Sequence, residues 1–128
     1  MLKVKTYLDK SPIHGIGVFA GENIKKGTIV WTMVEGFDMV LSKDFLTSLP
    51  PQAKKYLDTY SYTQKGVTIL TGDNDRFINH SEAPLARQLP NNDMIATRDI
   101  KKGEELTMDY REFDDAWQNK LVEAEAAA

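Results

Sequence analysis

Cysteine is absent from this 128-residue sequence, and histidine occurs only twice. A chain without cysteine forms no disulfide bond and no thiolate zinc site. Two histidines alone also disfavour a zinc site built without cysteine. We therefore predict no metal centre.

The sequence also has no long apolar segment. Its first ten residues, MLKVKTYLDK, contain no apolar run of the length found in signal peptides. No other stretch approaches the roughly 20 apolar residues of a membrane-spanning helix. We therefore expect a cytoplasmic protein with no membrane partner. The net charge of −3 argues against direct binding to nucleic acid, whose phosphates attract basic surfaces.

The remaining composition is that of one soluble domain, expected to span residues 1–128. Strand-like patterns occur at residues 2–8, 28–34, 66–71, 93–100 and 104–110, and the segment 11–20 opens with a Ser-Pro turn and two glycines before a short apolar strand. Two short helices are expected at 41–49, with Ser42 as N-cap, and at 51–60, with Pro51 in the first turn. A C-terminal helix is expected in the tail that follows residue 113, whose last Ala and Glu residues are either frayed or an expression scar. The sequence thus predicts a mostly β fold with a small helical insert.

Two further patterns allow a structural or a functional interpretation. The segment Ile-Lys-Lys-Gly occurs at 24–27 and again at 100–103, which predicts two similar tight turns with glycine at positive φ. Acidic residues dominate positions 104–115, where Arg111 is the one basic residue. Such a run has two interpretations. It is usually a solvated surface, and the alternative is an electrostatic field that attracts a cationic substrate. The pattern alone favours the solvated surface.

Polar side chains follow an apolar pair in the segment RFINHSEAPL, residues 76–85. Asn79, His80 and Ser81 come directly after Phe77 and Ile78. A Ser–His catalytic pair is disfavoured because neighbours on an extended chain point to opposite faces, and no G-x-S-x-G turn surrounds the serine. Asn-His-Ser also matches the glycosylation pattern, which means little without an export signal.

Other short motifs are weak when taken singly. HGIG (14–17) indicates either a turn or a place where a ligand approaches the backbone closely. GDND (72–75) is interpreted as a plain turn, because it is too short for a calcium loop. Tyr110 ends the segment ELTMDY, and most tyrosines in such a position are half-buried core residues.

Taken together and in order, three motifs resemble the SET-domain family of protein lysine methyltransferases: HGIGVFA (14–20), RFINHSEAP (76–84) and GEELTMDY (103–110). The resemblance spans residues 11–113, and the last two motifs are specific as a pair. It implies a β-clip-like fold of short, curved sheets. In that fold the RFINHS and ELTMDY segments are threaded together in a knot-like core, which places the polar trio beside the Tyr110 strand.

The resemblance also implies a cofactor, S-adenosylmethionine, and a set of site residues. Tyr110 matches the catalytic tyrosine, which also borders the cofactor. Arg76 either contacts the cofactor's carboxylate or stabilises the threaded core, and both remain open. Asn79 and His80 match residues that bind the amino-acid end and the adenine of the cofactor, and the backbone of His14, Gly15, Ile16 and Gly17 would touch the same cofactor. Phe113 or Trp117 would cover the adenine. Tyr60 and Tyr62 would line the lysine channel.

The sequence departs from the family pattern at two positions. Glu82 stands where many members have a cysteine, and Leu85 stands where they have a second asparagine. In those members the cysteine joins C-terminal cysteines on a zinc ion that forms one wall of the substrate channel. This chain cannot build that wall, so the C-terminal helix with Trp117 is expected to replace it, as in short stand-alone bacterial or viral members.

The predicted function is therefore methylation of a lysine in a basic protein, with the oligomeric state left open. The lysine must first lose a proton, which at pH 7 costs about 4.6 kcal/mol for a free side chain. No strong general base is evident among the motif residues, so a nearby sulfonium and an apolar channel are expected to lower the lysine pKa. Two alternatives remain: a catalytically silent SET fold that binds proteins, and a small β-rich interaction domain related only in fold.

Overall fold

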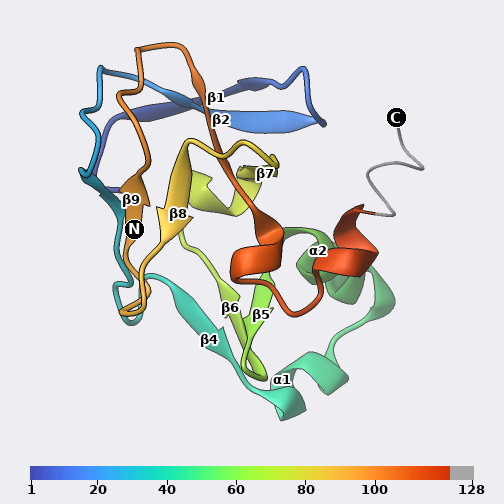
Figure 1. Ribbon diagram of the computed structural model, residues 1–128. Coiled ribbons are helices and arrows are strands. Elements are labelled where there is room, and N and C mark those ends of the chain that lie inside the picture. Colours follow the sequence, from blue (N-terminus) through green and yellow to red (C-terminus); the bar gives the residue numbers. More distant parts are fainter. Residues whose placement is uncertain (122–128) are drawn as a thin grey trace.

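The computed structural model describes residues 1–121 and consists mainly of short strands (Figure 1). The final Ala and Glu residues of the sequence lie outside the described residues. The elements in chain order are β1 Thr6–Lys10, β2 Ile16–Ala20, β3 Ile29–Trp31, β4 Met39–Leu41, α1 Lys43–Ser48, α2 Pro51–Tyr60, β5 Tyr62–Gln64, β6 Val67–Leu70, the 3₁₀-helix η1 Asn74–Phe77, β7 Asn79–His80, β8 Ala86–Gln88, β9 Met94–Ala96, β10 Glu105–Met108 and the 3₁₀-helix η2 Tyr110–Glu112.

The first sheet brings the two most specific sequence motifs side by side. Its strand order is β1-β2-β10-β7, and β10 runs parallel to β7. Thr107 pairs with Asn79 and Met108 with His80 in this register. The backbone amide of Ser81 extends the pairing by donating to the Met108 carbonyl at 2.9 Å. The ELTMDY segment therefore lies directly against the RFINHS segment.

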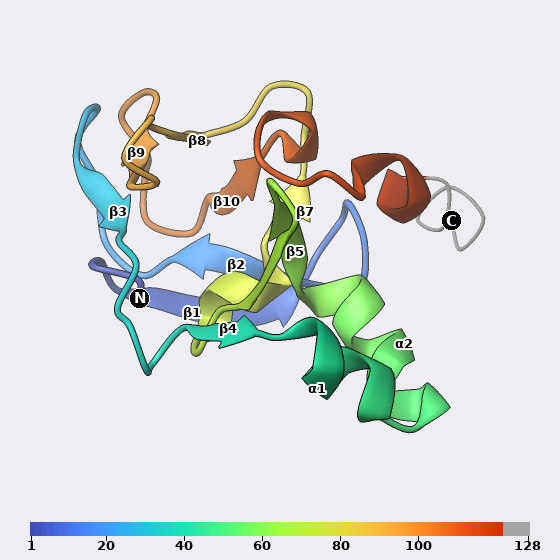
Figure 2. The ribbon, with the colours of Figure 1, turned by 90° about the horizontal axis from the view of Figure 1, so that it is seen from below.

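Two three-stranded sheets complete the fold, with the orders β3-β9-β8 and β4-β6-β5. Figures 1 and 2 both place α1 and α2 at the end of the molecule that carries β4 and β5, away from β9. The core lies between the first two sheets and includes the buried side chains of Val18 and Leu106 from one and of Val30, Trp31 and Met94 from the other. Burial of this apolar surface is the main stabilising contribution to the fold.

The helical insert agrees with the sequence prediction. The Ser42 hydroxyl accepts a hydrogen bond from the Phe45 amide at 3.1 Å and caps α1. Pro51 occupies the first turn of α2, and Leu57 is the buried residue of that helix. Within residues 1–121, neither these helices nor the start of the C-terminal helix at 117–121 have the length and apolar character needed to span a bilayer.

The two Ile-Lys-Lys-Gly turns also form as predicted. Gly27 and Gly103 have φ values of +84° and +92°, in the left-handed region that favours glycine. The preceding residues Ile24 and Ile100 form an antiparallel bridge with reciprocal backbone hydrogen bonds of 2.8 and 2.7 Å. The repeated motif therefore builds two turns that pack against each other.

Candidate active site

Tyr110 is held at both ends by residues of the RFINHS segment. It is the first residue of η2, directly after the strand β10 and Asp109. Its backbone amide donates to His80 Nδ1 at 3.1 Å, and its hydroxyl donates a short hydrogen bond to the Ile78 carbonyl. The phenol ring therefore has one defined position between β7 and the end of β10.

The same contacts argue against a Ser–His pair. Because His80 Nδ1 accepts from the Tyr110 amide, the neutral imidazole carries its proton on Nε2. The Ser81 hydroxyl accepts from the Ala83 amide at 3.1 Å instead of meeting the imidazole. Both side chains are thus used to shape the segment.

Asn79 connects this strand pair to the HGIG loop. Its side chain is buried, and its Nδ2 donates to the carbonyls of His14 and Ile16 at 3.0 and 3.3 Å. The same nitrogen donates to Glu105 Oε2 at 2.9 Å. Gly15, at the tip of the loop, has a φ of +48°. The fold thus gathers the residues predicted to bind the cofactor, and the observed role of Asn79 is to position the loop.

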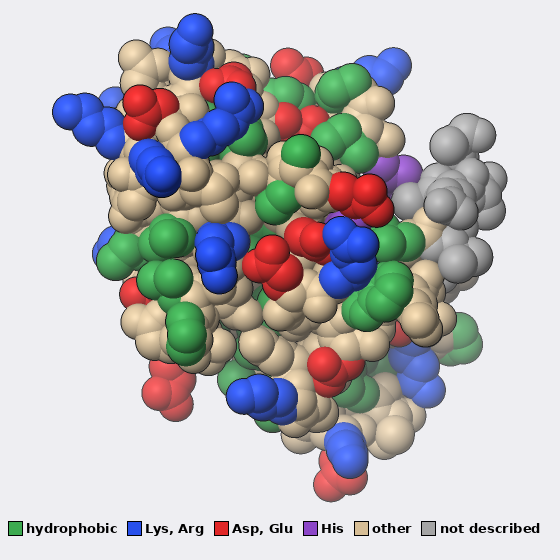
Figure 3. All heavy atoms as spheres, viewed as in Figure 1, with side chains coloured by type: hydrophobic (Ala, Val, Ile, Leu, Met, Phe, Trp, Pro, Cys, Tyr) green, Lys and Arg blue, Asp and Glu red, His purple; other side chains and the backbone are tan. Residues whose placement is uncertain are grey.

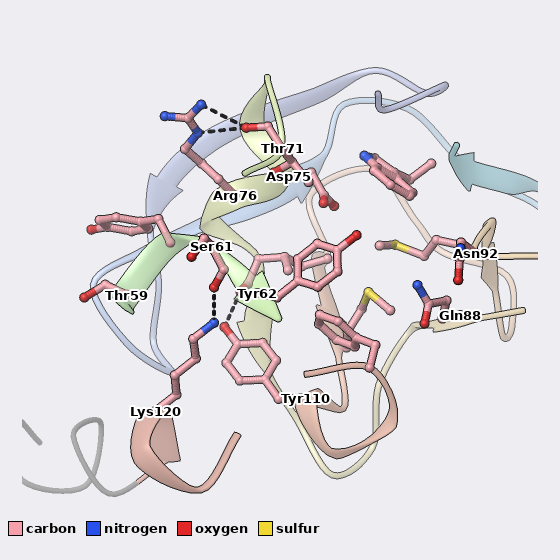
Figure 4. Close-up of a pocket in the computed structure, with 16 residues that line it drawn as sticks. Thr59, Ser61, Tyr62, Thr71, Asp75, Arg76, Gln88, Asn92, Tyr110 and Lys120 are labelled. Carbon is pink, nitrogen blue, oxygen red and sulfur yellow. Dashed lines mark hydrogen bonds between the residues drawn. The ribbon is translucent and has the colours of Figure 1, made fainter. Parts of the chain in front are cut away.

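A pocket with about 500 Å³ of open space lies beside the Tyr110 ring (Figure 4). Five aromatic side chains contribute to its wall: Trp31, Tyr60, Tyr62, Tyr110 and Phe113. Phe113 meets Tyr62 and Tyr110 edge-on, with ring centroids 5.3 and 5.8 Å apart. Such contacts fix ring orientation and contribute beyond simple burial. The two tyrosines proposed for the lysine channel therefore lie in one pocket with the proposed catalytic tyrosine.

The other aromatic and basic candidates fall in different places. Phe113 is buried in the wall of this pocket. Trp117 is half-buried on the C-terminal helix and is not among the described residues that line the pocket. Arg76 lines it, but its guanidinium donates to the Thr71 carbonyl at 2.9 and 3.0 Å and to the Tyr56 hydroxyl at 3.0 Å. Arg76 therefore holds its own loop together, and its contact with a cofactor stays a prediction.

Lys120 is a pocket residue that the sequence did not indicate. It extends from the C-terminal helix, and its side chain is only 13% exposed. Its ammonium donates to Asp114 Oδ2 at 2.5 Å and to the Ser61 carbonyl, and it lies 5.6 Å from the centroid of the Tyr110 ring. The C-terminal helix thus contributes a wall of the pocket through Lys120, whereas the expectation had named Trp117. Lys120 reaches the pocket because the tail folds back onto β5, where the Asp115 amide donates to the Thr63 carbonyl at 2.7 Å.

Burial keeps Tyr110 in its phenol form. Removal from water raises its pKa above the ordinary value, and the charges of Asp114, Asp75 and Glu105 raise it further. The pKa of Tyr62 is raised by burial in the same way. Both hydroxyls are therefore protonated at neutral pH, and that of Tyr110 donates its proton to the Ile78 carbonyl.

Three of the six acidic residues between positions 104 and 115 form ion pairs within the chain. The ion pairs are Glu104 with Arg98 at 3.2 Å, Asp109 with Arg111 at 2.7 Å and Asp114 with Lys120 at 2.5 Å. The Arg111 guanidinium holds the pKa of Asp109 below its ordinary value. On the face shown in Figure 3, acidic and basic side chains are interspersed. These pairs favour the structural interpretation of the run over that of a field that attracts substrate.

The comparisons with known proteins agree with this arrangement. The family model of the SET domain matches residues 15–111. The chain is 29% identical over 133 residues to the human and mouse proteins named histone-lysine N-methyltransferase 2D, a match that covers 88% of this chain but only 2% of the relatives' length.

Solved structures show the same fold. A Plasmodium falciparum protein provisionally named a histone methyltransferase superposes with a TM-score of 0.60 at 28% identity, covering 85% of this chain and 95% of that one. The Chaetomium thermophilum Polycomb Repressive Complex 2, in a humanized mutant form bound to an inhibitor, superposes with a TM-score of 0.64 at 22% identity. That match covers 91% of this chain and 16% of the other, and it shows likeness of fold alone.

Proposed function

The chain belongs to the SET-domain family, and we propose that it transfers a methyl group from S-adenosylmethionine to a lysine side chain of a protein. The observation that carries this proposal is the position of Tyr110. Its ring lies in the wall of an aromatic pocket, and its backbone meets His80 next to the loop held by Asn79. The phenol thus adjoins a pocket for a substrate side chain and the proposed cofactor site.

The residues of the HGIG loop fit the proposed cofactor. His14, Gly15 and Ile16 are exposed, and a Cβ atom placed on Gly15 would meet nothing within 4 Å. Backbone groups there are open to a ligand, and the half-buried His80 has its Nε2–H available for an acceptor. S-adenosylmethionine, when bound, would supply an electrophilic methyl group. The contribution of this chain would be to hold the amine in line with that group and to exclude water around it.

Lys120 supports the choice of a lysine as the acceptor. Its ammonium is already accommodated at the aromatic wall, 5.6 Å from the centroid of the Tyr110 ring. A cation near the face of a tyrosine is attracted by the electrons of the ring. The alkyl part of a substrate lysine would pack against Tyr60, Tyr62 and Phe113, which are largely apolar surfaces.

The direct test is a transfer experiment. The purified chain is incubated with deuterium-labelled methyl donor and a lysate of basic proteins, and tandem mass spectrometry locates the label. We expect labelled methyl groups on lysine side chains. Titration calorimetry with S-adenosylmethionine is run in parallel. If neither labelled lysine nor cofactor binding is detected, the proposed activity is wrong and the silent binding module becomes the better explanation.

Gly17→Ala is expected to weaken cofactor binding by roughly tenfold or more, a loss of at least about 1.4 kcal/mol. A Cβ atom at this position would lie 2.4 Å from Glu105 Oε2 and 2.8 Å from Glu105 Cδ. The displaced carboxylate would no longer hold Asn79 and Ser11, which order the loop. Calorimetry measures the affinity, and Ile13→Ala, an exposed residue of the same loop, is the matched control. Equal affinity of the Gly17 variant and the control would contradict this role of the loop.

A further inference from the structure

Three residues that line one pocket each carry a buried polar atom without a hydrogen-bond partner. Within residues 1–121, these unpartnered side-chain atoms are Trp31 Nε1, Thr71 Oγ1 and Asp75 Oδ1. All three residues line the pocket beside Tyr110. Buried polar groups are rarely left unpaired, because each costs the free energy of its lost hydration. Their shared location indicates that the pocket is built to hold a hydrogen-bonding ligand.

Asp75 is fixed by the same short segment that fixes the proposed catalytic tyrosine. Its amide donates to Asp73 Oδ1 at 3.2 Å, and its carbonyl accepts from the Ile78 amide at 3.0 Å. The Ile78 carbonyl in turn accepts from the Tyr110 hydroxyl. Figure 4 shows the Asp75 side chain entering the pocket from the side opposite Lys120. The carboxyl group and the phenol thus border the same space from η1 and η2.

The surroundings of Asp75 contain little positive charge. The residue is 6% exposed, and burial is the main cause that raises the pKa of its carboxyl group to about 7. The charges of Asp73 and Asp38 raise the pKa further, and only the amine of Met1 lowers it. The two cations of the pocket wall are engaged elsewhere, Lys120 with Asp114 and Arg76 with the Thr71 carbonyl. A ligand that satisfies Asp75 should therefore bring its own positive charge and N–H donors.

We propose that Asp75 receives the ε-ammonium group of the substrate lysine and accepts its proton, directly or through a water molecule held by Trp31 and Thr71. This inference rests on the proposed function, because it assumes that a lysine enters the pocket. In the step, one N–H bond of the ammonium breaks and its electron pair stays on nitrogen. An O–H bond forms on the carboxylate, which becomes a neutral acid and later releases the proton to solvent. The freed electron pair makes the amine a nucleophile for the methyl group.

Asp75 supplies the base that the motif residues lack. A free lysine has a pKa of about 10.4, whereas an ordinary aspartate has one of about 3.9, a gap of about 6.5 units. In the absence of substrate, burial raises the pKa of Asp75 to about 7, which narrows that gap before the substrate ammonium lowers the pKa again. Trp31 Nε1 donates, Asp75 Oδ1 accepts, and a water between them would satisfy both and complete a path for the proton.

The test compares Asp75→Asn, which keeps the shape of the side chain but cannot accept the proton, with the surface control Asp58→Asn on α2. We expect kcat for the labelled methyl transfer to fall by about 100-fold at pH 7.5, within the range typical of general-base loss. The deficit should narrow toward pH 9.5, where solvent deprotonates the lysine. Cofactor affinity should stay within about twofold for both variants. A variant with wild-type kcat and an unchanged pH profile would overturn the inference.

A second measurement does not depend on turnover. The carbon-13 resonance of the Asp75 carboxyl group is titrated with pH in the presence and absence of 50 mM N-acetyl-lysine amide and the demethylated cofactor. We expect the added ammonium to lower the pKa of Asp75, because a cation stabilises the carboxylate. N-acetyl-norleucine amide, which lacks the amine, should leave the pKa unchanged. If the wild type is inactive but the lysine compound still shifts the pKa of Asp75, the proposed function alone is rejected. If the wild type is active but the pKa of Asp75 does not shift, the role of Asp75 is rejected.

Discussion

Tyr110→Phe should reduce kcat for methyl transfer by about 100-fold or more, while cofactor affinity stays within about threefold of wild type. The substitution removes the hydroxyl that donates to the Ile78 carbonyl and leaves the ring in place against Phe113. Positioned groups of this kind contribute several kcal/mol to a displacement by holding reactants in line. Because the backbone amide still donates to His80, the proposed cofactor side of the site should survive.

The measurement for Tyr110→Phe combines single-turnover methyl transfer with calorimetric binding of S-adenosylmethionine. Tyr7→Phe removes the same hydroxyl from an exposed tyrosine of β1 and serves as the control. The control should keep wild-type kcat. If Tyr110→Phe transfers methyl groups as fast as the control, the phenol is a packing residue and the catalytic assignment fails.

Sequence motifs predicted the parts of this molecule that depend on local chemistry. Ser42 and Pro51 mark helix starts through capping and a fixed φ, and Gly27 and Gly103 mark turns through positive φ. The proximity of Asn79 to the His14–Gly17 loop followed from the family resemblance and is visible as hydrogen bonds. The cofactor contacts of these residues stay predictions.

Strand bounds were the least accurate part. The expected strand at 2–8 is β1 at Thr6–Lys10, and the expected strand at 28–34 is the three-residue β3. Strands β4, β5, β7 and β8 have only two or three residues, which is too short for any alternation of apolar and polar positions to be recognised. The helix expected after residue 113 begins only at 117, because residues 113–116 form turns in which Asp114 Oδ1 accepts from the Ala116 amide.

Two functional candidates had no local signal. Asp75 lies in GDND, whose sequence predicts a plain turn, and only the folded chain reveals that Asp75 is buried and lines a pocket. Lys120 lies in a tail whose composition is that of a solvated helix, yet its ammonium is held by Asp114 and Ser61. Burial and contact between distant segments are properties of tertiary structure, so a reading of local patterns misses them.

The buried acid should make the protein less stable as pH rises. The pKa of Asp75 is about 7 in the folded chain, against 3.8 for an unperturbed aspartate. The folded state therefore binds this proton more tightly than the unfolded state does. The stabilisation is fully present below about pH 4 and is lost as pH rises through 7. By pH 8 the loss would amount to about 4 kcal/mol, since each pKa unit corresponds to about 1.36 kcal/mol.

Asp75→Asn should remove this pH dependence, because the amide is neutral at every pH. Urea unfolding of the wild type and the variant at pH 5, 6, 7 and 8 measures the effect. We expect the variant to gain stability relative to the wild type between pH 5 and 7 and the gain to level off by pH 8, above the folded pKa, whereas Asp58→Asn follows the wild type. Parallel curves for wild type and Asp75→Asn would mean that the carboxyl group is not desolvated. If Asp75→Asn is more stable than the wild type but slower in methyl transfer, both results are as expected for a residue that serves the chemistry and lowers the stability.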